Sequence, residues 1–278
     1  MKDRIAITTK GGVADVRLVR GDKMNALDDA MFSALIEAGE TLKADRSVRA
    51  VVLSGEGRAF CAGLDMGNFG KMASGSGTPG GSGTPGGGAA QRPSTLTPRT
   101  HGIANRAQYA VWVWRELPMP VIAAVHGVAF GGGFQVALGA DMRYAAPDAR
   151  FSIMEIKWGL VPDMGGTQIM RHLARDDVVR ELTYTGRIFS AEEALIFGFA
   201  TRICEDPHAT ALETAREIAA KSPDAIRAAK RLMTASRISD PAVGLLLESR
   251  EQDQIMGGDN QIESVMAALE KREARFKD

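Results

Sequence analysis

The sequence predicts an α/β fold, in which strands of a mainly parallel sheet alternate with helices along the chain. Apolar and polar residues alternate over residues 4–9 and again over 13–20, which indicates two half-buried strands. Apolar residues at helical spacing follow over about 28–45. Two mainly apolar segments, at 48–54 and 121–127, need cover on both faces, as parallel strands between helices have. Strand and helix signals in this order favour α/β architecture.

The first elements carry their own boundary signals. Gly11 and Gly12 separate the two alternating segments and supply a turn. Asp28 is the candidate N-cap of the first helix, which we expect to end near Asp45. The apolar positions of this helix recur at intervals of four, three and four residues: Met31, Leu35, Ala38 and Leu42.

The C-terminal part has helical signals and no strand signal. Ser222-Pro223 is an N-cap followed by proline at the first helical position, and further helical stretches cover 241–256 and 259–276. We therefore divide the chain into an α/β core over residues 1–205 and a C-terminal helical region over 206–278. The pattern leaves open whether these helices pack on their own core or on a neighbouring subunit.

Charge and cysteine content narrow the classes of function. The 278 residues include 34 basic and 34 acidic side chains. A nucleic-acid groove or an anionic membrane surface needs a basic excess, so we expect neither as a partner. Cys61 and Cys204 are too few for a disulfide framework, and they lack metal-ligand spacing. Because the first residues also lack a secretory apolar stretch, we expect a cytoplasmic protein.

A glycine-rich repeat interrupts the α/β pattern. Residues 76–87 are two copies of SGTPGG, and we expect a mobile surface loop over about 70–93. Both copies match the dinucleotide-binding pattern G-x-G-x-x-G. However, no strand precedes either copy, and Pro79 and Pro85 stand where a helix should begin. The repeat therefore does not predict a nucleotide site.

Two glycine-bearing turns, by contrast, each follow a predicted buried strand. Residues 55–65 follow the first strand, and residues 128–135 follow the second. The second turn contains three consecutive glycines, Gly131 to Gly133, at the start of a predicted helix. Free amides there carry the positive end of the helix dipole and could stabilise an oxyanion. Close packing of helix on strand is the alternative explanation for these glycines.

A third segment, residues 151–167, contains two carboxylic acids. Glu155 stands among apolar residues, so an apolar wall around it would raise its pKa toward the operating pH of a general acid or base. Asp163 follows eight residues later, across a turn with glycine and proline that could return it to the same cleft. Taken alone, a glutamate such as Glu155 is more often exposed or paired in a salt bridge than catalytic.

Together the three segments resemble the crotonase superfamily, the enoyl-CoA hydratase/isomerase family. The stretches that carry the resemblance are 23–27, 58–65, 126–133 and 158–167. The resemblance implies a crotonase-like spiral of ββα repeats with a C-terminal helical trimerisation region. It also implies an acyl-CoA thioester substrate and a homotrimer, or a hexamer built from two trimers.

The resemblance also implies roles for residues at the matching positions. The backbone amides of Leu64 and Gly132 would form the oxyanion hole that holds the thioester carbonyl. Coenzyme A would be bound by a set of residues on the two N-terminal turns: Lys23, Met24, Ala26, Arg58, Ala62 and Asp65.

The type of reaction depends on three positions. Family hydratases have glutamates at the positions of Glu155 and Gln135, but an amide cannot abstract a proton from water. Dienoyl-CoA isomerases of the family have a glutamate and an aspartate at the spacing of Glu155 and Asp163, and an aspartate where Gln135 stands, so two of the three positions match. We therefore favour double-bond isomerisation over hydration, with Glu155, Asp163 and Gln135 as the catalytic group. A catalytically weak acyl-CoA-binding protein, an acyl-CoA hydrolase and an NAD(P)-dependent dehydrogenase are the alternatives.

Overall fold

The computed structural model describes residues 1, 3–73 and 96–278 of the chain. The SGTPGG repeat at 76–87 lies outside the described residues. So does most of the loop predicted over about 70–93, whose first four residues instead end a helix, α2 (Met66–Ala73).

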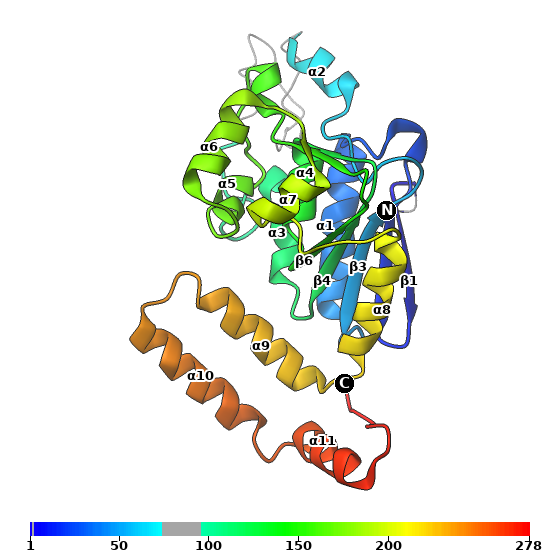
Figure 1. Ribbon diagram of the computed structural model, residues 1–278, viewed down its shortest axis with the longest axis vertical. Helices are drawn as coiled ribbons and strands as arrows, with labels where there is room; N and C mark the ends of the chain where they lie inside the picture. The colour runs from blue at the N-terminus through cyan, green and yellow to red at the C-terminus, as the bar shows by residue number, and fades with distance from the viewer. Residues whose placement is uncertain (2, 74–95) are drawn as a thin grey trace, which may run out of the picture.

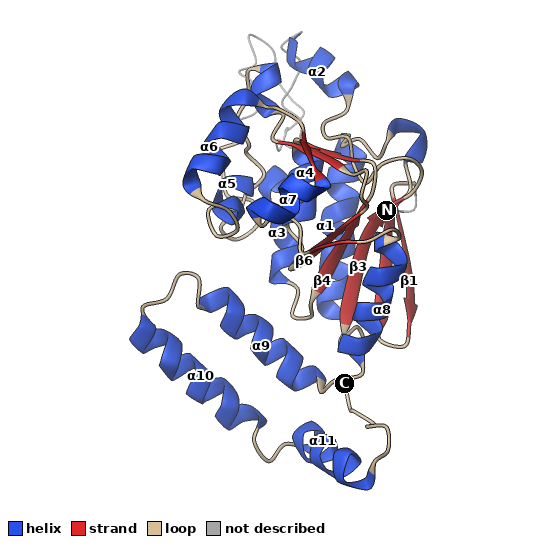
Figure 2. Ribbon diagram, in the orientation of Figure 1, coloured by secondary structure: helices blue, strands red, loops and turns tan. Residues whose placement is uncertain are grey.

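A sheet of six strands forms the centre of the molecule and confirms the predicted α/β class (Figures 1 and 2). The two strands of the N-terminal hairpin pair antiparallel, and every following neighbour in the sheet pairs parallel. In spatial order the strands are β1 (Ile5–Lys10), β2 (Val13–Leu18), β3 (Ala50–Gly55), β4 (Val121–Val125), β6 (Met142–Ala145) and β9 (Arg202–Ile203).

Successive residues of the central strands point into two different cores. Val51 and Leu53 of β3 pack in the larger core with α1 (Asp29–Ala44) and α3 (Arg106–Glu116). Val52 of the same strand packs in a smaller core against α8 (Pro207–Ala219). The apolar run at 48–54 therefore reflects a strand covered on both faces, as predicted. Helix α8, which the sequence assigned to the C-terminal region, covers the main sheet.

A second, three-stranded sheet carries the elements around the cavity described below. It consists of β5 (Val128–Phe130), β7 (Arg150–Ser152) and β8 (Phe189–Ser190). Aromatic rings of Phe134, Phe151 and Phe189 meet edge-on or stacked beneath it. The short elements nearby are η1 (Gly21–Lys23), α4 (Gly132–Leu138), η2 (Glu155–Trp158), α5 (Gly166–Met170), α6 (Asp176–Thr185) and α7 (Ala191–Phe197).

The last three helices extend away from the main sheet, as Figure 1 shows. They are α9 (Pro223–Ala235), α10 (Pro241–Ile255) and α11 (Asp259–Glu270). Lys230 anchors α9 to the core, because its ammonium is 2.8 Å from both Met119 O and an Asp141 carboxylate oxygen. Helix α10 has no buried residue, and α10 and α11 expose large apolar side chains such as Leu246 and Leu269. Among the described residues, no helix is long and apolar enough to cross a membrane.

Candidate active site

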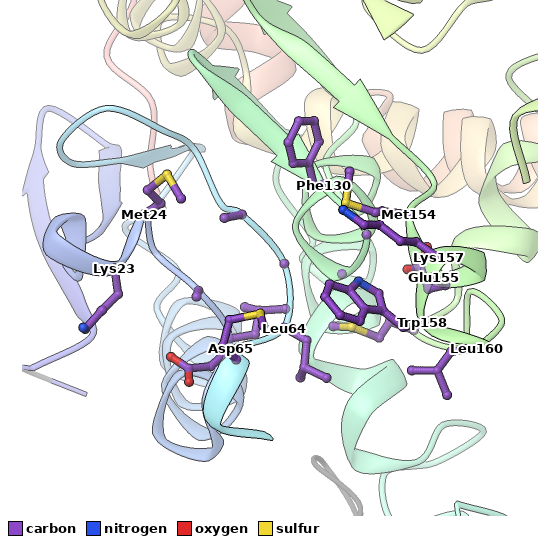
Figure 3. A pocket seen from close by; sticks show the side chains of 18 of the residues that line it. Lys23, Met24, Leu64, Asp65, Phe130, Met154, Glu155, Lys157, Trp158 and Leu160 are labelled. Carbon is purple, nitrogen blue, oxygen red and sulfur yellow. The ribbon is translucent and has the colours of Figure 1, made fainter. Parts of the chain in front are cut away.

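A cavity of about 1220 Å³ lies between the N-terminal turns and the segments that follow β5 and β7. In Figure 3, Lys23, Met24 and Asp65 lie on one side of it, and Phe130, Glu155 and Trp158 on the other. All eleven residues that the sequence analysis placed at the site are close to this cavity, and every one of them except Gln135 lines it directly.

Asn25 fixes the first turn of the cavity wall. It is fully buried and adopts a left-handed backbone conformation, with φ of 54°. Its carboxamide nitrogen donates to Glu56 O at 3.0 Å and to Ala59 O at 2.8 Å, and its Oδ1 accepts from Arg20 N at 2.9 Å. The turn at 23–26 is thereby attached to the turn at 56–59. The sequence analysis missed this residue, although an asparagine is a frequent non-glycine residue at positive φ.

Arg20 is a second residue that the sequence analysis did not identify. Its Nη1 donates to Ala26 O at 3.0 Å and to Asp65 Oδ2 at 2.7 Å. Partial burial favours protonation of Asp65, but hydrogen bonds from Gly67 N and Arg20 outweigh it and hold the pKa of Asp65 below its ordinary value. The Asp65 carboxylate therefore holds two turns of the wall together while it lines the cavity.

Two cations stand at the mouth of the cavity on this side. Lys23 and Arg58 are both exposed. Within the described part of the chain, no carboxylate lies within 4.0 Å of either side chain. Both charges are therefore free to meet an anionic group of a ligand.

The two predicted oxyanion-hole amides come from neighbouring backbone segments. Cys61 N donates to Val128 O at 3.0 Å and Phe130 N donates to Cys61 O at 3.1 Å, so the two glycine turns run side by side. A Cβ built on Gly63 would lie 3.7 Å from Gly132 N. Over residues 3–73 and 96–278, neither Leu64 N nor Gly132 N donates a hydrogen bond. Two unused N–H groups therefore lie close together at the cavity.

The three glycines of the second turn have different reasons for lacking a side chain. Gly131 has φ of 51° and donates its N–H to Ser152 O at 2.9 Å. A Cβ on Gly133 would overlap Cys61 O, so here the packing explanation holds. Gly132 faces the cavity, where a Cβ would lie 2.8 Å from Leu27 Cδ1 and 2.9 Å from Met164 Sδ. Close packing and access to a ligand thus both contribute to the triple glycine.

Glu155 is the buried acid of the site. It begins η2, its exposed fraction is 9%, and its Oε1 accepts a hydrogen bond of 2.7 Å from Gln135 Nε2. Its Oε2 is buried from solvent and has no hydrogen-bond partner among the described residues. Burial raises the pKa of Glu155 above its ordinary value, the Gln135 hydrogen bond opposes this rise, and the charge of Asp163 adds to it. A raised pKa brings a carboxyl group closer to the range in which general acids and bases exchange protons.

Asp163 returns to the same cavity, as the turn after Glu155 predicted. Its side chain is accessible through the open cavity, yet enough protein surrounds it that desolvation raises the pKa of Asp163. Gln135 lies behind the wall, where its Oε1 accepts hydrogen bonds of 2.9 Å from Met164 N and from Gly166 N. The structure therefore brings the three predicted residues together.

The remaining wall is mainly apolar, although Lys157 also lines it. Phe130, Met154, Trp158, Leu160 and Ile188 line the cavity beyond Glu155, where the chain of an apolar ligand would fit. Over the described ranges, no group of three metal-ligating side chains occurs. A large cavity with convergent N–H groups and acids of perturbed pKa is typical of an enzyme active site.

Comparison with known proteins agrees with this class. The family model described as enoyl-CoA hydratase/isomerase matches residues 13–278. The mouse mitochondrial Δ(3,5)-Δ(2,4)-dienoyl-CoA isomerase is 32% identical over 267 residues, which are 95% of this chain and 78% of that protein. The mouse mitochondrial methylglutaconyl-CoA hydratase is 29% identical over 273 residues, covering 96% of this chain and 80% of that protein.

Solved structures give the same result. The crystal structure of an enoyl-CoA hydratase from Bacillus anthracis superposes with a TM-score of 0.83 at 26% identity and covers 99% of both chains. An enoyl-CoA hydratase from Polaromonas sp. JS666 gives a TM-score of 0.82 at 25% identity, covering 99% of this chain and 100% of that one. The chain belongs to the enoyl-CoA hydratase/isomerase family and has the crotonase-like α/β fold. It is an enzyme of the hydratase or isomerase type.

Proposed function

We propose that this protein isomerises a double bond in an unsaturated acyl-CoA thioester. The observation that carries the proposal is the pair of acids in one cavity, Glu155 and Asp163, each with a raised pKa. Moving a double bond requires one proton to leave the acyl chain and another to enter it at a different carbon. Two acids along the cavity can serve these two steps.

The amides of Leu64 and Gly132 make the first step accessible. When a base removes the α-proton of a thioester, the electron pair delocalises onto the carbonyl oxygen, which becomes an enolate. Two fixed N–H groups stabilise that oxygen without any reorganisation at the moment of reaction, and each such donor is worth roughly 2.7–4 kcal/mol of barrier.

Glu155 and Asp163 then exchange protons with the chain. The Glu155 carboxylate takes the α-proton, and Asp163 in its protonated form donates a proton to the far end of the conjugated system. Substrate and product have the same composition, and no water is consumed. Proton exchange with solvent through the open cavity returns both acids to their starting states.

The neutral side chain at Gln135 argues against hydration as the main reaction. Adding water across a double bond calls for a base that activates the water molecule, and an amide has no such capacity. The similarity to a methylglutaconyl-CoA hydratase nevertheless keeps hydration as the second candidate. In that case Glu155 or Asp163 would have to activate the water molecule alone.

Coenzyme A would lie against the N-terminal turns. Met24, Ala26 and Ala62 line the cavity without charge, as contacts to the pantetheine arm require. Lys23 and Arg58 carry charges suited to phosphates, and Asp65 keeps the two turns in place. No cofactor is needed for this reaction, because coenzyme A is part of the substrate.

Self-association is also part of the proposal. The exposed apolar side chains of α10 and α11 support a homotrimer or hexamer, whose mass light scattering on a sizing column would measure. A cytoplasmic location stays a prediction, since relatives such as the dienoyl-CoA isomerase are described as mitochondrial.

Product identification tests the proposed reaction. The enzyme is incubated in deuterated water with crotonyl-CoA, a 3-enoyl-CoA and a 3,5-dienoyl-CoA, and the products are analysed by NMR. Isomerisation predicts a shifted double bond with deuterium on a chain carbon and no new hydroxyl group. A 3-hydroxyacyl product as the main species would instead establish hydration, and binding without any turnover would point to a binding protein.

A further inference from the structure

Gln135 connects the two acid-bearing turns from behind the cavity wall. It lies on α4 with an exposed fraction of 1%. Both partners of its Oε1, the amides of Met164 and Gly166, are N–H donors, so the oxygen of the carboxamide must face them. The Nε2 group is thereby directed to Glu155 Oε1, which it reaches at 2.7 Å.

Gly166 is shaped around this contact. A Cβ placed on Gly166 would lie 2.7 Å from Gln135 Oε1 and 2.9 Å from its Cγ, closer than ordinary van der Waals contact. Any larger residue at position 166 would therefore displace the carboxamide. Together with the hydrogen bond from Gly166 N, this close contact indicates that the turn after Asp163 closes directly onto Gln135.

We infer that Gln135 is a positioning residue, which holds the Glu155 turn and the Asp163 turn in one arrangement and fixes the Glu155 carboxylate through its Oε1 for proton transfer with the substrate. The inference rests on the proposed function in one respect, namely that Glu155 is the base. Gln135 itself transfers no proton and does not touch the acyl chain.

The neutral charge of this side chain matters as much as its position. The hydrogen bond from Gln135 favours the ionised form of Glu155 and so limits the rise in pKa that burial causes. The other charged groups beside Glu155 are Asp163, whose charge opposes ionisation, and Lys157, which lines the same cavity. A carboxylate at position 135 would face Glu155 directly, and the two acids would share one proton.

The test measures the pKa of Glu155 without any substrate. The full-length protein is labelled with ¹³C at the glutamate carboxyls and studied by NMR. The signal that is missing from the spectrum of Glu155→Gln belongs to Glu155, and it is followed through a pH titration. Gln135→Met keeps the length of the side chain and removes its hydrogen bonds. We expect this variant to raise the Glu155 pKa by about one unit and Gln135→Glu to raise it further.

Gly166→Ala is the second variant, because it changes no polar group. It should displace the carboxamide and move the Glu155 pKa in the same upward direction. Arg175→Met is the control, since it breaks only an exposed ion pair with Asp177, and it should leave the pKa and the turnover as in the wild type. If Gln135→Met does not fold, the shift of the Glu155 pKa in Gly166→Ala tests the inference in its place.

Kinetics give the second readout. For Gln135→Met and Gly166→Ala we expect kcat to fall roughly 10- to 100-fold and KM to change less than about threefold. The apparent pKa of the acid limb in the pH profile of kcat/KM should rise. A lower melting temperature with an unmoved Glu155 pKa and an unmoved acid limb would overturn the inference and leave Gln135 a purely structural residue. Hydration products from the wild type would refute the proposed reaction but not this role of Gln135.

Discussion

Arg20 Nη1 lies 2.7 Å from Asp65 Oδ2, and this ion pair connects the two turns on the side of the cavity where we propose that coenzyme A binds. The same nitrogen donates to Ala26 O at 3.0 Å. Both side chains are about four-fifths buried, at 17% and 20% exposed. Solvent therefore screens the attraction between them less than it screens a surface ion pair. The shape of this wall therefore depends on a residue that itself has no role in proton transfer.

Replacing Arg20 tests that dependence. Arg20→Met should raise KM for the acyl-CoA substrate roughly tenfold, corresponding to about 1.4 kcal/mol, and change kcat less than about twofold. Steady-state kinetics measure both. Arg175→Met breaks an exposed ion pair with Asp177 and serves as the control with unchanged kinetics. A fall in kcat at constant KM would contradict this account of Arg20.

Glu155→Gln tests the proposed base. The amide keeps the shape of the side chain and can still accept the hydrogen bond from Gln135, but it cannot take a proton. We expect turnover to fall about 100-fold or more, while calorimetry with a saturated acyl-CoA shows nearly unchanged binding. Weakened binding with unchanged turnover is the result that this role does not allow.

Gly132 and Leu64 allow a paired test of the oxyanion hole. Gly132→Val places carbon atoms where Leu27 and Met164 already stand and should displace the turn, with a loss of about 10²- to 10³-fold in kcat. Leu64→Ala retains the backbone N–H, so its loss should stay below about tenfold. Equal losses in the two variants would argue that side-chain packing, and not the amides, supports catalysis.

Stability should depend on pH through Glu155. Its pKa is raised in the folded state, so the folded protein binds this proton more tightly than the unfolded chain does. The stabilising contribution of Glu155 is full below its ordinary pKa and is lost as the pH rises through the raised value. The stability of the wild type relative to Glu155→Gln should therefore decrease over that interval, as urea denaturation at several pH values would show. A difference that is constant with pH would contradict the raised pKa.

The main sheet was predictable because its strands carry simple periodic patterns. Alternation over 4–9 and 13–20 corresponds to β1 and β2, and the apolar runs correspond to β3 and β4. The short strands β5, β7, β8 and β9 have two or three residues each, too few to show a period. They depend on tertiary packing, and the sequence analysis did not find them.

The candidate site was predictable where a motif marks it. The glycine turns and the segment from Glu155 to Asp163 led to the same cavity. No sequence motif identifies Asn25 or Arg20. Their roles arise from contacts that only the folded chain brings together, with Glu56, Ala59 and Asp65. The bond between Gln135 and Glu155 is of the same kind, since it joins residues 20 positions apart.

The most direct test of the account is exchange of the α-protons of a saturated acyl-CoA with deuterated water. Such a substrate has no double bond to move or hydrate, so the exchange reports only the removal of the α-proton by Glu155 and the stabilisation of the enolate by Leu64 N and Gly132 N. We predict exchange with the wild type and with Asp163→Asn, and at least about 100-fold slower exchange with Glu155→Gln. Equal exchange rates for the wild type and Glu155→Gln, or no exchange by the wild type, would contradict the account.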